Sequence, residues 1–176
     1  MISLVTYNPI ECQQAIERIK NFLESYHGRR QVFILVGLFG SGKSWCINKT
    51  CPDNIVNFNL TVSQEIANKI SDNLWSTSEI ISQSDRIGPM ILDIYTDIIN
   101  NAPDILAIDN IEILYKYPYF DFITTAEKLA GTTKKVLISI PGFVLDNSIY
   151  FVDKHLHNMS ISGRLDRYFE LKGESI

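Results

Sequence analysis

The sequence predicts a three-layer α/β fold in which helices cover both faces of a mostly parallel, five-stranded sheet. The first observation is a set of short, continuously apolar runs such as 105–108, typical of parallel strands that are buried on both faces. The second is the alternation of these runs with amphipathic segments of helical spacing. The third is the length of 176 residues, which fits one domain that buries about 70% of its unfolded surface. We therefore expect a single domain over residues 1–176.

The chain is expected to begin with a helix. Asn8 can cap this helix, and Pro9 suits its first position because proline is tolerated there. The helix should end near Gly28, so residues 1–28 form an N-terminal helical segment. An apolar strand at 31–36 follows and leads directly into a glycine-rich loop.

The glycine-rich loop reads Gly-Leu-Phe-Gly-Ser-Gly-Lys-Ser at 37–44, a complete phosphate-binding P-loop. Its glycines let backbone N–H groups form a concave nest around phosphate oxygens. Lys43 would bind the β and γ phosphates, Ser44 would coordinate Mg²⁺, and the following helix would direct its positive end at the phosphates. The loop predicts ATP and Mg²⁺ as ligands. Trp45 is included although a tryptophan there is more often a core or interface anchor, so the predicted ligand-binding residues are Gly37, Gly40, Ser41, Gly42, Lys43, Ser44 and Trp45.

The remaining elements follow from the same kinds of signal. The P-loop helix should run over 42–50 and stop before Pro52. A later helix should start at Ile87 because Pro89 is tolerated only in its first turn. In chain order we further expect a strand at 54–59, a helix capped by Ser63, a loop or helical turn at 76–85, the helix 87–101, a strand at 104–109, a helix at 121–130, a strand at 135–140 before Pro141-Gly142, and a strand at 168–171, whereas 143–162 has no clear assignment.

Asp109 ends the apolar strand 104–109. It fits the position of the carboxylate that P-loop proteins offer to the Mg²⁺ shell from the end of a strand beside the P-loop strand. The alternative is a surface aspartate that caps the turn. Many hydrolytic P-loop ATPases follow this aspartate with a glutamate that orients water, but here the next residue is Asn110, which cannot accept a proton. Three options stay open: Asn110 positions water, Glu112 swings in, or hydrolysis is slow.

The spacing of the two motifs resembles that of AAA+ and related ATPases. Lys43 and Asp109 lie 66 positions apart, which leaves room for an intervening strand and two helices. In those ATPases a strand separates the P-loop strand from the next strand in sequence, and small-molecule P-loop kinases usually lack it. The resemblance implies that Ser139, at the end of a strand, is a polar sensor for the γ-phosphate. A structural buried serine is the alternative.

Arginines near the C-terminus fit a further AAA+ feature. Arg164 lies before the last strand, where that family often offers an arginine to the nucleotide of a neighbouring subunit. Such an arginine finger can raise turnover about 10³- to 10⁵-fold. Arg167 is the reserve candidate, and surface salt bridges with Asp166 or Glu170 are the alternative for both arginines.

Three further segments resemble the BrxF family, the small P-loop proteins of bacteriophage-exclusion (BREX) systems. The similarity covers roughly 29–142, the expected nucleotide-binding core, and is carried beside the P-loop by NFNL at 57–60, GPMILDI at 88–94 and IDNIEIL at 108–114. It implies a role in antiviral defence beside larger ATPase and DNA-modifying partners. Complete AAA+ proteins also carry a helical lid, for which 143–176 leaves no room, so we expect another chain to complete the site, in a homo-oligomer or a larger complex.

Composition limits the other classes of protein. The 16 basic and 20 acidic residues give a net charge of −4 without long runs of either sign, so charge alone does not favour nucleic acid. A local patch could still bind it, and DNA could be contacted through a larger complex. Three cysteines without metal spacing fit a reduced, cytoplasmic setting. We expect no membrane segment, because no apolar run approaches the roughly 20 residues that span a bilayer.

These features lead to one main functional hypothesis and two alternatives. The main hypothesis is an AAA+-like subunit that binds ATP and hydrolyses it, slowly or with partners, in a BREX defence assembly. The alternatives are a nucleotide-gated interaction module with negligible hydrolysis and a small-molecule P-loop kinase, although no arginine-rich lid is seen. The expected Mg²⁺ ligands are Ser44 and Asp109, and the expected catalytic residues are Lys43, Asp109, Asn110, Glu112, Ser139 and Arg164.

Overall fold

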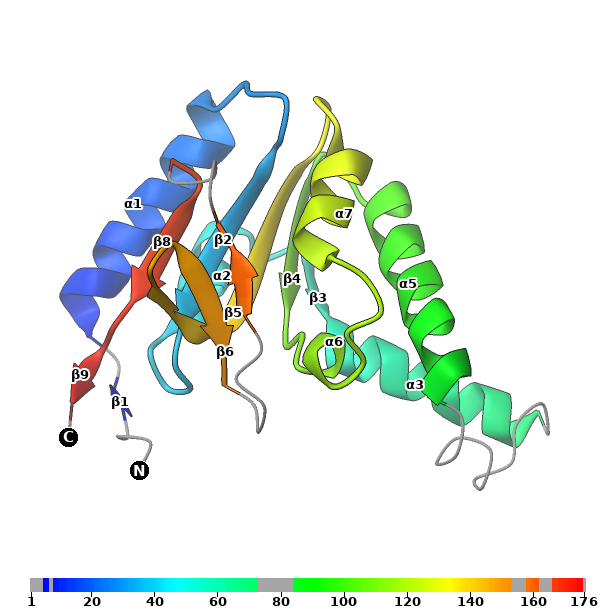
Figure 1. Ribbon diagram of the computed structural model, residues 1–176. Helices are drawn as coiled ribbons and strands as arrows, with labels where there is room; N and C mark the ends of the chain where they lie inside the picture. Colours follow the sequence, from blue (N-terminus) through cyan, green and yellow to red (C-terminus); the bar gives the residue numbers. More distant parts are fainter. Residues whose placement is uncertain (1–4, 7, 73–83, 153–157, 162–165, 176) are drawn as a thin grey trace.

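The central feature of the molecule is a sheet of five parallel strands. We describe a computed structural model for residues 5–6, 8–72, 84–152, 158–161 and 166–175. All four pairings within the five-stranded path are parallel, and the spatial order is β3-β4-β5-β2-β8 (Figure 1). The predicted α/β class with a mostly parallel sheet is confirmed. The five strands are β2 (Val32–Gly37), β3 (Ile55–Asn57), β4 (Ile105–Asp109), β5 (Lys135–Leu145) and β8 (Tyr168–Leu171).

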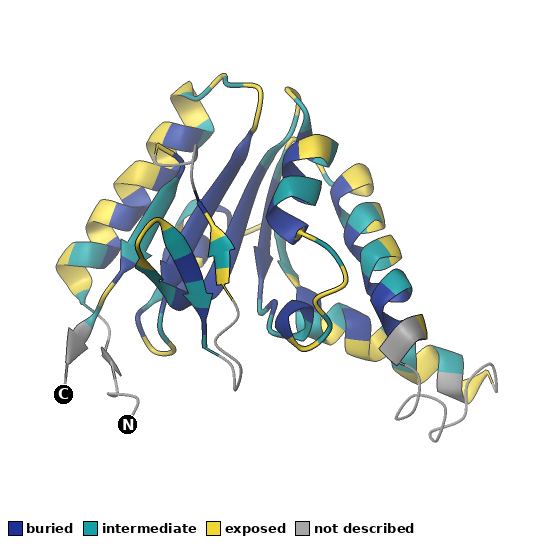
Figure 2. Cartoon of the chain, viewed as in Figure 1, coloured by how far each residue is buried: buried dark blue, intermediate teal, exposed yellow. Residues whose placement is uncertain are grey.

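Helices cover both faces of this sheet, as expected from strands that are apolar on both faces. Alternate residues of β2 divide between two hydrophobic clusters: Phe33 and Leu35 pack with α1 and α2, whereas Ile34 and Val36 pack with α5 and α7. Figure 2 shows the resulting band of buried residues along the central strands. The helices are α1 (Pro9–Ser25), α2 (Lys43–Thr50), α3 (Phe58–Ser71), α5 (Ser84–Asn101), α6 (Ile113–Lys116) and α7 (Phe122–Ala130).

Side-chain hydrogen bonds cap the starts of α1 and α3, and the predicted start of α3 is wrong. The Asn8 side chain accepts hydrogen bonds from the N–H groups of Ile10 and Glu11, so α1 begins as predicted. Helix α3 begins at Phe58, five residues before the predicted cap at Ser63, because the Asn57 side chain accepts from Leu60 N at 3.0 Å. Strand β3 accordingly ends at Asn57 and does not extend to Asn59.

The start of α5 also differs from the prediction. The helix begins at Ser84, so Pro89 lies in its interior and not in its first turn. A proline here removes one intrahelical hydrogen bond, and the burial of Ile91, Tyr95 and Ile99 against the core stabilises the helix. Most of the predicted loop 76–85 lies outside the described residues.

Strand β5 does not end before Pro141-Gly142, as the sequence suggested. It continues to Leu145, and its second half pairs antiparallel with β6 (Ser148–Phe151), which in turn pairs with β7 (Asn158–Ser160). The connecting residues Asp146 and Asn147 have φ values of 48° and 57°, as a tight hairpin turn requires. Part of the unassigned stretch 143–162 therefore forms an antiparallel extension of the sheet.

Helix α7 and strand β8 match their predictions closely. Asp121 caps α7 by accepting from Thr124 N at 2.8 Å, and β8 has the expected bounds. A two-stranded antiparallel ladder of β1 (Val5–Thr6) and β9 (Glu174–Ser175) was not predicted. It brings the two ends of the chain side by side (Figure 1).

Two consecutive lysines tie helices on opposite faces to one strand. Lys135 Nζ, at the start of β5, donates to Leu23 O in the last turn of α1 at 2.5 Å. Lys134 Nζ donates to the carbonyl oxygens of Ile99 and Asn100 in the last turn of α5. Each ammonium stabilises a negative helix end and satisfies carbonyls that have no intrahelical partner.

Candidate functional site

The glycine-rich loop lies between the end of β2 and the start of α2. Gly40 and Gly42 adopt φ values of 85° and 96°, which L side chains rarely tolerate, and Gly42 is the N-cap of α2. Gly37 is needed for close packing, because a Cβ there would lie 2.4 Å from Ser41 Oγ and 2.8 Å from Leu171 O. The glycines of the motif therefore shape the loop in the way that the sequence predicts.

A cavity of about 290 Å³ lies beside this loop. It gathers residues from the P-loop, the first turn of α2, the loop after β4 and the middle of β5. The set includes most of the residues that the sequence predicted for a site, and two of its members, Phe39 and Pro141, were not predicted. The lining residues are Phe39, Gly40, Gly42, Lys43, Ser44, Trp45, Asp109, Asn110, Glu112, Ser139 and Pro141.

Ser44 and Asp109 meet in this cavity although 65 positions separate them. Ser44 Oγ donates to Asp109 Oδ2 at 2.6 Å, and Asp109 Oδ1 accepts from Asn110 N at 3.0 Å. Strand β4, which ends at Asp109, is not the neighbour of β2 as expected, because β5 lies between them. The pair presents a hydroxyl and a carboxylate, the hard oxygen donors that Mg²⁺ prefers.

Lys43 is buried at the base of the loop, with 8% of its surface exposed. Its Nζ donates to Gly37 O at 2.7 Å and to Leu38 O at 2.9 Å, and it lies 5.9 Å from the centre of the Phe39 ring. Burial lowers the pKa of Lys43 to about 8, against the opposing influence of the Asp109 charge. The ammonium is therefore mostly charged at neutral pH and is held by the loop's own carbonyl groups.

The loop after β4 is held by Asn59, which the sequence analysis missed. Asn59 N donates to Asn110 O at 2.8 Å, its Oδ1 accepts from Ile113 N at 3.0 Å, and its Nδ2 donates to Glu112 Oε2 at 2.5 Å. Asn110 has a φ of 55°, a left-handed conformation that asparagine tolerates better than most residues. The Glu112 carboxylate therefore has a defined position at the cavity wall. A polar residue just after a strand was the available signal for Asn59.

Ser139 lies in β5 between β2 and β4, where it is 1% exposed and lines the cavity. Its Oγ forms no hydrogen bond with the part of the chain that the structure describes. A buried hydroxyl without a partner costs on the order of 1–3 kcal/mol, so this position favours a polar group in the cavity.

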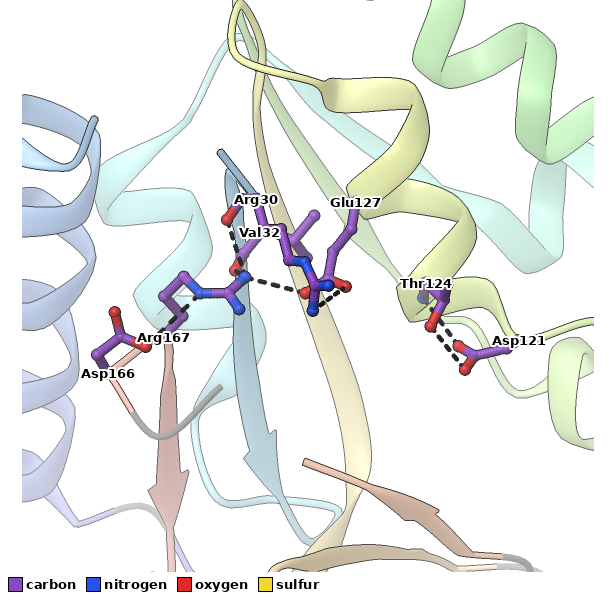
Figure 3. A network of polar contacts seen from close by, with 7 residues as sticks. All are labelled: Arg30, Val32, Asp121, Thr124, Glu127, Asp166 and Arg167. Atoms are coloured by element: carbon purple, nitrogen blue, oxygen red, sulfur yellow. Dashed lines mark hydrogen bonds and ion pairs between the residues drawn. The ribbon is translucent and has the colours of Figure 1, made fainter. Parts of the chain in front are cut away.

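The arginine candidates have different outcomes. Arg164 lies outside the described residues, so its predicted role is neither supported nor opposed. Arg167 is 3% exposed, and its Nη1 lies 3.0 Å from Glu127 Oε1 (Figure 3). The same nitrogen donates to Arg30 O at 2.8 Å, and Arg167 Nε is 3.6 Å from Asp166 Oδ1. Arg167 is thus a buried structural residue, which rules out its reserve role as an arginine finger.

Two large side chains stand at the edge of the cavity. Trp45 is 40% exposed and Phe39 is 56% exposed, so neither is a core anchor. Lys49 Nζ lies 5.6 Å from the Trp45 ring centre. The cavity therefore has an aromatic rim that faces solvent in the single chain.

Comparisons with known proteins return no relative. The chain matches no protein-family model, no curated protein and no solved structure. Within the described ranges, no helix combines the length and apolarity needed to cross a bilayer. Those ranges also contain no group of three or more His, Cys, Asp or Glu side chains arranged to hold a metal ion.

Proposed function

We propose that this protein binds ATP with Mg²⁺ in the P-loop cavity and hydrolyses ATP as an AAA+-like subunit. The observation that carries the proposal is the 2.6 Å contact between Ser44 Oγ and Asp109 Oδ2. It joins the end of the P-loop motif to a strand-end carboxylate in one cavity with Lys43. A hydroxyl and one carboxylate, completed by phosphate and water oxygens, are a typical donor set for Mg²⁺.

The loop backbone, Lys43, Ser44, Asp109 and Ser139 each have a role in this proposal. Backbone N–H groups of the loop bind phosphate oxygens, and Lys43 exchanges the carbonyls of Gly37 and Leu38 for the β and γ phosphates. Ser44 and Asp109 hold Mg²⁺, which neutralises phosphate charge when it is bound. The buried Ser139 hydroxyl donates to the γ-phosphate, which supplies the partner that it otherwise lacks among the described residues.

The strand order supports an AAA+-like core over a small-molecule kinase. Strand β3 is the next strand in the sequence after β2, yet β5 and β4 lie between them in the sheet. This separation is the feature that the AAA+ resemblance implies and that small-molecule P-loop kinases usually lack. We therefore propose that the α/β core is a P-loop NTPase of AAA+ type.

Glu112 is the group that we propose to orient the attacking water. Its carboxylate lines the cavity and is fixed by Asn59, so it can accept a hydrogen bond from water. Asn110, directly after Asp109, lacks a basic group and contributes only hydrogen bonds. An asparagine at this position, where many hydrolytic P-loop ATPases have a glutamate, favours the second candidate function, a nucleotide-gated interaction module with negligible hydrolysis.

The aromatic rim supports an assembly. Phe39 and Trp45 expose large apolar surfaces beside the cavity, and such surfaces often lie in interfaces. We propose that a second copy, or a larger protein of a BREX defence complex, covers this rim, with DNA contacted only through that complex. Light scattering with and without ATP should show a mass increase that Trp45→Ala reduces. An unchanged monomer under all conditions would argue against a homo-oligomer.

ATP binding is tested by calorimetry with and without Mg²⁺. Lys43→Ala should weaken ATP binding about 10- to 100-fold, because a charge-assisted contact to phosphate is lost. Lys128→Ala removes the same charge from an exposed position on α7 and should leave affinity unchanged. If Lys43→Ala bound ATP as tightly as the parent, the proposed site would be wrong.

Hydrolysis is tested separately by steady-state turnover over a range of protein concentrations. Glu112→Gln should reduce turnover at least about 100-fold while ATP still binds, because the amide cannot accept a proton. A parent protein that binds ATP and forms its assembly without turnover would favour the nucleotide-gated module instead.

A further inference from the structure

Helices α3 and α5 diverge from each other on one face of the sheet (Figure 1). An open groove of about 490 Å³ lies between them, and we call it the α3–α5 groove. It is separate from the P-loop cavity and shares no lining residue with it. Helix α3 contributes Thr61, Gln64, Glu65, Asn68 and Lys69, and α5 contributes Met90, Asp93, Ile94, Asp97 and Ile98.

The floor of the groove is apolar. Helix α5 carries one stripe, Ile91, Tyr95 and Ile99, that is fully buried in the core. A second stripe, displaced by one residue, consists of Met90, Ile94 and Ile98 and lines the groove. Ile94 and Ile98 are only half-buried. Helix α3 therefore leaves part of an apolar face of α5 in contact with solvent.

The rim of the groove is acidic. Asp93 and Asp97 are exposed, lie one helical turn apart, and form no ion pair with a residue in the described ranges. Like charges at this spacing repel each other. On the opposite side, Glu65 lies 3.6 Å from Lys69. Three carboxylates and one ammonium thus surround an apolar floor, a combination that attracts cations and repels nucleic acid.

We propose that the α3–α5 groove binds a basic amphipathic helix of a partner protein. Charge complementarity identifies this occupant: lysine or arginine side chains would pair with Asp93 and Asp97, while the apolar face of the helix covers Ile94 and Ile98. None of the described helices carries more than two lysine or arginine residues, so a second copy is a poorer fit. The proposal does not depend on nucleotide binding at the other site.

A synthetic 18-residue peptide tests the proposal directly. The probe is an amphipathic helix of leucine and lysine, and its counterpart carries glutamate in place of lysine. Fluorescence anisotropy should show binding of the lysine peptide alone. Asp93→Asn with Asp97→Asn should weaken that binding about tenfold, as expected for two exposed ion pairs. No binding of the lysine peptide to the parent would overturn the proposal.

Two further variants separate docking from general attraction to a negative protein. Glu17→Gln with Glu24→Gln removes the same charge from the exposed face of α1 and should change affinity less than about twofold. Ile94→Asp adds negative charge, so general attraction predicts tighter binding, whereas groove docking predicts weaker binding in a variant shown to be folded by circular dichroism. Equal losses in both double variants would overturn the proposal. So would a parent dimer that the Asp93→Asn, Asp97→Asn variant dissolves, because the occupant would then be a second copy.

Discussion

In the proposed ATP site, Lys43 exchanges one set of hydrogen-bond acceptors for another. Its ammonium is buried and bound to the carbonyls of Gly37 and Leu38. Those two acceptors are neutral, and a phosphate would replace them with charged ones. Burial also lowers the pKa of Lys43 to about 8, so the strength with which its side chain would bind phosphate depends on pH.

We expect ATP affinity to fall above pH 8. There Lys43 is increasingly neutral in the free protein, so binding must take up a proton, and the dissociation constant should rise about tenfold per pH unit. Calorimetry in buffers of different ionisation enthalpy measures the proton uptake. The ATP affinity of the Lys43→Arg variant should not fall in this pH range, because arginine stays charged there. A parent protein with flat affinity up to pH 9.5 would contradict the role of the ammonium.

The same lowered pKa of Lys43 affects the free protein with a defined sign. Between about 8 and the ordinary value of 10.5, the unfolded chain binds the lysine proton and the folded chain does not. Stability contributed by this residue therefore rises with pH through that window. Nucleotide affinity and this component of stability should thus change in opposite directions as pH increases.

Asn59 fixes Glu112 and the adjacent loop, so in the proposed hydrolysis it is a positioning residue. We expect Asn59→Ala to lower kcat about tenfold while KM for ATP changes less than about twofold, since the phosphate-binding groups are untouched. Ser71→Ala removes an exposed polar group from the far end of the same helix and serves as a control. An equal effect on kcat in both variants would indicate a general disturbance of α3.

Local patterns predicted the cavity-lining residues that lie within motifs, but not the residues whose position depends on distant contacts. The P-loop and Asp109 are recognisable because a few neighbouring residues define each of them. Asn59 was missed because its partner Glu112 is 53 positions away. Arg167 was misjudged because its burial depends on Glu127, 40 positions away, which no local signal shows.

At the scale of elements, a buried ion pair fastens the edge strand β8 to helix α7. Arg167 and Glu127 have side-chain exposures of 4% and 3%, and Arg167 also donates to the carbonyl of Arg30 before β2. Removing Arg167 takes away the 3.0 Å ion-pair partner of the buried Glu127 carboxylate, and the remaining Arg30 contact is longer, at 3.9 Å, and comes from an exposed side chain.

We expect Arg167→Met to lower the free energy of unfolding by about 3–5 kcal/mol in urea denaturation. Arg30→Met is the matched control: Arg30 lies 3.9 Å from the same glutamate but is 62% exposed, so its loss should cost less than about 1 kcal/mol. Adding Glu127→Met to Arg167→Met should recover much of the stability. If the two single arginine variants behaved alike, burial would not be the source of the effect.

Element types were more predictable than element limits. The doubly apolar runs identified β2, β4 and most of β5, because strands that are buried on both faces have little choice of sequence. The start of α3 was misplaced because Asn57 caps it ahead of Ser63. The end of β5 was misplaced because Pro141-Gly142 normally stops a strand, whereas here Gly142 permits close contact with Tyr150 of β6.

At the scale of the whole molecule, helix α3 connects the two sites that we propose. Its first turn holds the loop of Asn110 and Glu112 through Asn59, and its middle lines the α3–α5 groove. A change in the position of this helix therefore reaches both sites. Residue patterns alone could not give the strand order that creates this arrangement, because pairing between β3 and β4 joins segments about 50 positions apart. Only the AAA+ resemblance implied that β2 and β3 are separated in the sheet.

If both proposals hold, ligands at the two sites should influence each other. The lysine peptide should tighten ATP binding at least about fivefold, and ATP should tighten peptide binding by the same factor, as linkage requires. Asn59→Ala should remove this coupling while peptide affinity without ATP stays unchanged. Calorimetric titration of each ligand in the presence and absence of the other measures both factors. Two unequal factors at equilibrium would show that a second process contributes.

The paired lysines at the start of β5 have a consequence for how the molecule opens. Lys134 and Lys135 hold the last turns of α5 and α1, which belong to separate hydrophobic clusters on opposite faces of the sheet. The start of β5 therefore holds the C-terminal ends of two helices, one from each helical layer. Local fluctuations that free β5 should release both helix ends together, so their amide protons should exchange with solvent through one shared opening reaction.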